Sequence, residues 1–213
     1  MSGVQLRTGR VEPWRPARVA IEPWTILRLA RYRRREEAPA PVWEATRAMA
    51  ARAEELAAPA ARLRVVGVVN VAADRVTLAE GPSFTGQAIA RHLAGARRAV
   101  AFVLTLGPAL EAEVIALGER QEALEAYLLD LAGWAGLEAA VRALRQHLVR
   151  SLPGDRVSHR LGPGHRDWPL TEQGMLLSIF DEPDAPVRLS EHGVLIPFKS
   201  ISGLFAIRSA PAP

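Results

Sequence analysis

The residues from Arg160 to His165 are the part of this sequence best equipped to bind a small polar ligand. The side chain of Arg160 offers a planar fork of donors for a carboxylate. The Gly162-Pro163-Gly164 turn is expected to expose backbone N–H and C=O groups for an adenine edge or an amino-acid ammonium. The ring of His165 can lie against a base or a sulfonium. The alternative interpretation is an arginine salt bridge beside an ordinary loop.

Other kinds of chemistry find little support in the sequence. It contains no GxSxG, Walker, HExxH or Rossmann glycine motif, and no two histidines have the i, i+4 spacing of a local metal site. His165 and His192 could form an acid–base or metal site through the fold, although surface histidines are the default alternative. The absence of cysteine excludes thiol nucleophiles and thiolate metal sites in this chain, and it fits a reducing compartment.

Length and charge define the class of protein. A chain of 213 residues can bury a core without metals or disulfides, so we expect one domain over residues 1–213, with an extended lead-in over 1–16 and a flexible tail over 208–213. The sequence has no apolar run long enough for a membrane span and no signal-peptide pattern, which predicts a cytoplasmic protein with no membrane partner. The basic run over residues 31–35 is followed by two glutamates, which favours a solvated helix end over nucleic-acid binding.

The periodicity of the sequence predicts the elements that must position these residues. Proline, serine and threonine at helix starts, together with runs of β-branched residues, are the main signals. Helices are expected over residues 23–30, 42–58, 84–93, 108–117, 122–152 and 171–180, with Ser83 and Thr171 as caps. Strands are expected over residues 18–22, 63–71, 75–78, 99–106, 187–189, 193–196 and 203–207.

The longest predicted helix carries two carboxylates near its apolar stripe. Glu138 falls on the stripe that begins at Leu124, and Asp130 lies toward its border. Such carboxylates need a partner, which is either one of the many arginines or a ligand. Gly133 and Gly136 leave a bare patch on the same helix, where we expect another backbone or a ligand to come close.

Several motifs together resemble the S-adenosylmethionine-binding activation domain of cobalamin-dependent methionine synthase. The segment from Arg160 to His165 resembles the Arg-x-x-x-Gly-Tyr motif of that family, with histidine in place of tyrosine. The spacing of Asp130 and Glu138 resembles its Asp-x7-Glu pattern. The segments over 167–173, 189–191 and 197–203 resemble the short, free-standing relatives of the domain.

The resemblance implies a fold and a set of ligand contacts. The implied fold class is α+β, with helices packed around a twisted, mainly antiparallel sheet. Arg160 would hold the methionine carboxylate of S-adenosylmethionine, and the backbone of Leu161, Gly162, Pro163 and Gly164 would meet the ligand beside His165. The synthase domain has a glutamate six residues before the arginine, and Asp155 is the candidate to replace it. The remaining residues that the resemblance implies as supporting are Asp130, Glu138, Glu191, Ser200, Ser202 and Gly203.

The implied function is that of a stand-alone activation module. It would bind S-adenosylmethionine and support reductive methylation of cobalamin carried by a partner methionine synthase or corrinoid methyltransferase, with electrons from a reductant protein. A second interpretation is a non-catalytic assembly subunit of a corrinoid methyltransferase with a decayed groove. A third is an unrelated enzyme that uses His165 and His192.

Overall fold

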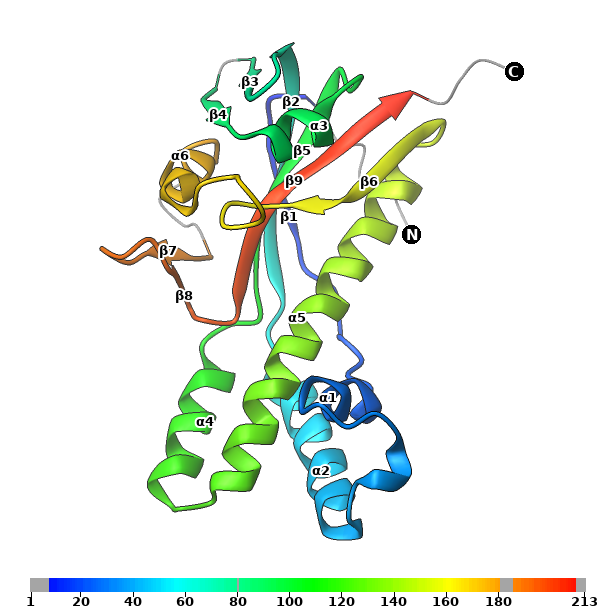
Figure 1. The fold of residues 1–213 in the computed structure, drawn as a ribbon, viewed down its shortest axis with the longest axis vertical. Helices are drawn as coiled ribbons and strands as arrows, with labels where there is room; N and C mark the ends of the chain where they lie inside the picture. The colour runs from blue at the N-terminus through cyan, green and yellow to red at the C-terminus, as the bar shows by residue number, and fades with distance from the viewer. Residues whose placement is uncertain (1–7, 80, 181–185, 210–213) are drawn as a thin grey trace.

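The computed structural model describes residues 8–79, 81–180 and 186–209, and it is built around an antiparallel sheet (Figure 1). The 7-stranded sheet has the order β4-β3-β2-β5-β9-β6, with β1 pairing alongside β2. Its strands are β1 (Val11–Trp14), β2 (Ala60–Val71), β3 (Arg75–Leu78), β4 (Ser83–Thr85), β5 (Arg98–Thr105), β6 (Asp155–Leu161) and β9 (Ser200–Ser209). A separate hairpin joins β7 (Arg188–Leu189) to β8 (Leu195–Ile196). The predicted α+β class with a mainly antiparallel sheet is confirmed.

Helices cover both faces of this sheet. They are α1 (Pro23–Leu29), α2 (Ala40–Leu56), α3 (Gln87–Leu93), α4 (Ala109–Glu119), α5 (Ala123–Ser151) and α6 (Gln173–Leu177), with short 3-10 turns η1 (Arg35–Glu37) and η2 (Leu170–Glu172). In Figure 1 the long helix α5 runs beside the sheet, and α1, α2 and α4 gather around its first half. The other end of the molecule carries α3 beside β3 and β4.

Strand β5 lies at the centre of the core, and its alternating residues serve two hydrophobic clusters. Phe102 points into the cluster formed with α1, α2, α4 and α5, and its ring stacks on that of Phe205 at 4.8 Å between centroids. Val103 points to the opposite face, into the cluster formed with α3, α6 and Trp168. Because successive strand residues face opposite sides of a sheet, a strand buried on both faces reads as a continuous apolar run.

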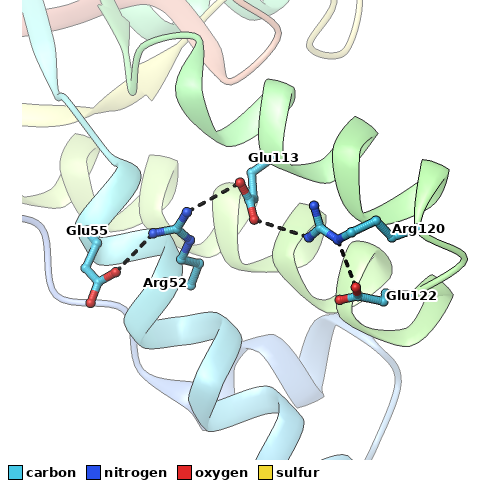
Figure 2. Close-up of polar contacts among 5 residues, drawn as sticks. All are labelled: Arg52, Glu55, Glu113, Arg120 and Glu122. Carbon is cyan, nitrogen blue, oxygen red and sulfur yellow. Dashed lines mark hydrogen bonds and ion pairs between the residues drawn. The ribbon is translucent and has the colours of Figure 1, made fainter.

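A network of ion pairs joins the helices that surround the first half of α5 (Figure 2). Arg52 of α2 bridges Glu55 and Glu113 at 3.3 and 3.4 Å. On α4 Glu113 also meets Arg120 at 3.6 Å, and Arg120 reaches Glu122 at 2.8 Å. The hydrogen bond that Arg120 donates to Glu122 is the main reason that the pKa of Arg120 is raised. These pairs are largely exposed, so packing rather than charge is expected to hold the helices together.

Three predictions at the start of the chain need correction. Residues 18–22 are not a strand: the N–H of Ile21 donates to Glu54 Oε1 at 2.8 Å instead of joining a ladder. The predicted lead-in includes a strand, since Val11–Trp14 pairs with β2. The helix expected from residue 84 begins at Gln87, because Ser83–Thr85 pairs with β3 and Ser83 therefore caps nothing.

The later predictions fare better, with smaller changes at the boundaries. The hairpin of β2 and β3, the strand β5 and the helices α1, α2, α4 and α5 all occur where they were expected. No side-chain cap from Thr171 is present, and the predicted helix is split into η2 and α6. Ser209 still belongs to β9, so the expected flexible tail does not begin at 208. The rest of that tail, residues 1–7 of the lead-in and residues 181–185, which follow the last predicted helix, lie outside the described residues.

Candidate ligand-binding groove

Strands β6 and β9 approach each other very closely where the candidate motif begins. A side chain on Gly162 would collide with the carbonyl oxygen of Ser202, and one on Gly203 would collide with that of Leu161. The pairing of Leu161 with Leu204 sets this register. Both glycines are therefore required by strand packing, which accounts for them without any ligand.

The turn from Gly162 to Trp168 uses much of its own hydrogen-bonding capacity. The N–H of Gly164 donates to Trp168 O at 2.9 Å, and the N–H of His165 donates to Gly162 O at 3.1 Å. Gly164 has φ +83°, in the left-handed region that favours glycine. The N–H of Gly164, which was expected to be free for a ligand, is therefore bonded within the turn.

Asp167 ties the turn to helix α3. Its carboxylate accepts hydrogen bonds from the N–H groups of Gln87 and Ala88, both at 2.8 Å. The first N–H groups of a helix have no partners inside the helix, so this aspartate, distant in sequence, caps α3 in place of Ser83. The bond from Ala88 is the largest cause that lowers the pKa of Asp167.

Trp168 and Glu172 fix the other end of the turn inside the core. Trp168 is buried and packs edge-on against Phe84, with ring centroids 5.2 Å apart. Its indole N–H donates to Glu172 Oε2 at 2.9 Å, and Thr85 donates from its hydroxyl to Glu172 Oε1 at 2.5 Å. The buried carboxylate is thus satisfied by neighbours on β4 and in the turn.

Arg160 lies between a helix carboxylate and an imidazole. Its Nη2 pairs with Glu138 Oε1 on α5, and its Nη1 lies 3.3 Å from His165 Nε2. Because a guanidinium can only donate, a hydrogen bond between these two groups requires Nε2 of His165 to act as the acceptor. The Arg160 side chain is only 16% exposed, whereas that of Glu138 is 50% exposed, so the carboxylate is the partner that can move away into solvent.

A second ion pair stands two turns earlier on the same helix. Asp130 accepts from Lys199 Nζ at 2.6 Å, and the lysine side chain is only 2% exposed. The ammonium also lies 4.3 Å from the ring centroid of Trp134 and 5.3 Å from that of Phe198. Gly133 makes room for the lysine stem, since a Cβ there would lie 2.7 Å from Cε. The bare patch predicted on α5 thus faces side chains, not a backbone or a ligand, and Gly136 likewise faces Ile21 and Leu106.

A groove of about 230 Å³ opens beside these two ion pairs. Trp134 and Phe198 form its aromatic corner, with ring centroids 5.8 Å apart. Gln173 is buried and donates to Ser202 Oγ at 2.5 Å. The groove is lined by Trp134, Pro163, His165, Leu170, Gln173, Gly193, Val194, Leu195, Phe198, Ser200, Ile201 and Ser202. An apolar groove with a few convergent polar groups is typical of a small-molecule site.

A larger, basic hollow of about 650 Å³ adjoins the groove at His165, which lines both. Three arginines from three segments border it, namely Arg91 of α3, Arg160 of β6 and Arg166 of the turn. His92 also borders it, and burial is the main cause that lowers the pKa of this histidine. The groove and the hollow together offer an apolar end and a cationic end.

The structure brings only some of the predicted site residues together. Arg160, Glu138 and His165 are in contact, and the groove also holds Pro163, Ser200 and Ser202. The other predicted residues do not line the groove, although Arg160 and Leu161 border the adjoining hollow. Asp155 pairs with Arg98 at 2.7 Å at the far end of β6, Glu191 is exposed beside His192, and Gly203 is buried beneath Leu161.

Sequence reasoning gave no binding role to the groove residues Trp134 and Gln173. The signal available in the sequence was the spacing of Trp134, four residues from both Asp130 and Glu138, which places all three on one face of a helix. The proposed pair of His165 and His192 receives no support. Within the described residues no group of three metal-ligating side chains converges, and none of the helices found there is long and apolar enough to cross a membrane.

Comparison with known proteins adds one finding about the fold. No family model matches the chain, and no curated protein matches it significantly. Among solved structures it is similar to a crystal structure of the MetH reactivation domain bound to AdoHcy, with a TM-score of 0.66 and 16% sequence identity. The match covers 99% of this chain and 82% of that one. At this identity the likeness concerns the fold.

Proposed function

We propose that this chain binds S-adenosylmethionine across the groove and the basic hollow, as a stand-alone activation module for a cobalamin-dependent methyltransferase. The observation that carries the proposal is the position of Arg160 beside the groove, in a fold similar to a domain solved with AdoHcy. The guanidinium would receive the ligand carboxylate, and the methyl donor would serve reductive methylation of cobalamin on a partner methionine synthase or corrinoid methyltransferase. A separate reductant protein would supply the electron.

The dimensions of the site support a ligand that spans both cavities. The groove of about 230 Å³ is smaller than the roughly 300–1,000 Å³ typical of sites for whole drug-sized ligands. The basic hollow of about 650 Å³ continues from it past His165. A ligand with a flat apolar end and a charged amino-acid end therefore has a place for each.

The lack of an acid–base pair in the groove is compatible with this role. The reduced cobalt of the partner would supply the nucleophile, so this chain needs only to hold the sulfonium methyl group in position. Arg160 would hold the carboxylate end, and the anchored turn would keep His165 in place.

The absence of cysteine from the sequence supports a cytoplasmic location, which cell fractionation would test.

Calorimetric titration with S-adenosylmethionine and S-adenosylhomocysteine tests the proposal. Replacing Arg160 with alanine removes a charge-assisted contact, which should weaken binding by roughly 10- to 150-fold. The matched control is Arg156→Ala, an exposed arginine of the same strand, which should bind like the wild type. No detectable binding of either ligand at millimolar concentration, with or without the corrinoid protein, would refute the proposal.

One observation favours the alternative of a non-catalytic assembly subunit. Arg160 already has partners in Glu138 and His165, so its guanidinium is engaged without a ligand. In that case Arg160→Ala would leave the activity of the partner methyltransferase intact in a complementation assay. A loss of complementation that accompanies the loss of ligand binding would exclude this alternative.

A further inference from the structure

Lys199 is an exception in the composition of this chain. It is the sole lysine among the 27 lysine and arginine residues of the sequence, and its side chain is only 2% exposed. Its stem passes over Gly133, where even a Cβ would come within 2.7 Å of Cε and 3.1 Å of Cδ. The compact ammonium suits this space, whereas the wide planar head of an arginine needs more room. The space beside Gly133 therefore suits the shape of lysine better than that of arginine.

The ammonium of Lys199 lies behind the aromatic corner of the groove. It lies 4.3 Å from the ring centroid of Trp134 and 5.3 Å from that of Phe198. Both rings line the groove and are 38% and 47% exposed as whole residues. Asp130 balances the charge from α5 at 2.6 Å. The two rings thus separate a buried cation from the space that a ligand would occupy.

This arrangement decides which part of a ligand the corner accepts. A ring whose electron-rich face already meets a cation attracts a second cation less. A neutral flat ring still gains contact area and stacking against Trp134. Gln173, Ser200 and Ser202 line the same groove, where Gln173 Nε2 already donates to Ser202 Oγ and the Ser200 hydroxyl is bonded to Thr105 and Pro197.

We propose that the corner of Trp134 and Phe198, backed by Lys199, is a subsite for a neutral purine-like ring and discriminates against a cation. The subsite proposal rests on the proposed function only for the identity of the whole ligand. For S-adenosylmethionine, the adenine would occupy the corner, the sulfonium would lie beside His165, and the carboxylate would reach Arg160. Lys199 is then a positioning residue for the rings and sets the charge preference of the subsite.

The position of Lys199 can be measured without any ligand. Protein labelled with ¹⁵N-lysine has one side-chain Nζ signal, because the sequence contains one lysine. Ring currents from Trp134 and Phe198 should shift the attached and neighbouring protons upfield, and burial should slow their exchange with water. Signals at free-lysine positions in rapid exchange would overturn the arrangement on which the subsite depends.

Ligand titration then tests the subsite itself. Adenosine, which has no carboxylate or sulfonium, should shift the Lys199 signal, whereas S-methylmethionine, a sulfonium without a purine, should leave it in place. Trp134→Ala should weaken adenosine binding by roughly tenfold. The control is Trp43→Ala, since Trp43 also carries a cation on its ring, from Arg35 at 4.2 Å, but lies on α2 away from the groove. Equal losses in both variants, or no effect of adenosine on Lys199, would refute the subsite.

The charge preference has a separate test. The probe 1-methyladenosine has nearly the shape of adenosine but a positively charged ring at neutral pH, so the wild type should prefer adenosine by roughly tenfold or more. The double variant Asp130→Asn with Lys199→Met removes both charges and should narrow that preference. An unchanged ratio would refute the role of Lys199. If adenosine binds but S-adenosylmethionine and S-adenosylhomocysteine do not, the proposed function is refuted and the subsite is supported. If those two ligands bind but adenosine does not, the proposed function is supported and the subsite is refuted.

Discussion

Burial governs the behaviour of His92, whose imidazole lies between α3 and the sheet. Its Nε2 is 3.3 Å from both Leu204 O and Ser158 Oγ. Desolvation is the largest cause that lowers its pKa from the ordinary value of 6.5, and nearby Arg208 adds to the effect. The folded protein therefore binds fewer protons at this site than the unfolded chain below about pH 6.5.

This difference predicts a loss of stability on mild acidification. As pH falls from about 6.5 toward the lowered folded pKa, protonation favours the unfolded chain, so the free energy of unfolding should decrease. In urea unfolding at several pH values, the free energy of unfolding of His92→Gln should depend less steeply on pH than that of the wild type. The control is His192→Gln, at a side chain 81% exposed, which should retain the wild-type dependence. Identical curves for His92→Gln and the wild type would contradict the prediction.

Glu172 is a buried carboxylate whose partners all donate hydrogen bonds. It accepts from Thr85 N at 3.1 Å and from the Thr85 hydroxyl and the Trp168 indole. An amide offers only one oxygen, so Glu172→Gln should leave a buried donor unsatisfied and lower stability by about 1–3 kcal/mol. Denaturant unfolding measures this, and indole proton exchange of Trp168 should accelerate. A fully stable variant would show that the donors find other partners.

At the scale of elements, the pairing of β6 with β9 depends on two glycines. Gly162→Ala or Gly203→Ala would push a methyl group into the backbone of the opposite strand, with an expected loss of about 1–3 kcal/mol or more. Gly118→Ala on α4 is the control. Its Cβ would meet nothing within 4 Å, so it should be neutral or gain up to about 1 kcal/mol. Thermal unfolding of the three variants makes the comparison.

The elements also show how far the sequence could predict the fold. Long periodic or β-branched stretches such as α5 and β5 were predicted from local pattern, because burial imposes that pattern directly. The errors occur where a distant partner decides. The start of α3 is set by Asp167, and the extended chain at Ile21 is held by Glu54. Such partners are invisible to a local reading.

The candidate site was predictable to a similar extent. Arg160 and His165 are recognisable from their residue types and spacing, and the fold does bring Glu138 to them. Trp134 and Gln173 acquire their place only from the register of α5, β9 and α6. The prediction that Asp155 lies beside Arg160 in the site was wrong, because five residues of a strand span about 16 Å.

At the scale of the whole molecule, β5 belongs to both hydrophobic clusters. The domain prediction for residues 1–213 has not been tested and stays a prediction, and the shared strand supports one cooperative unit. Phe102→Ala and Leu93→Ala, one in each cluster, should lower stability by about 3–5 and 2–5 kcal/mol. Both should shift one common transition in near- and far-ultraviolet circular dichroism. Two separate transitions would divide the chain into independent units.

The anchoring of the turn that carries His165 has a consequence for the kinetics of association. Asp167 holds this turn to α3, Trp168 seats it in the core, and Gly162 fixes its start against β9. This turn would therefore already have its bound conformation when a ligand arrives, so binding would require no loop closure. The encounter rate should vary with solvent viscosity and, because of the arginines around the hollow, with ionic strength.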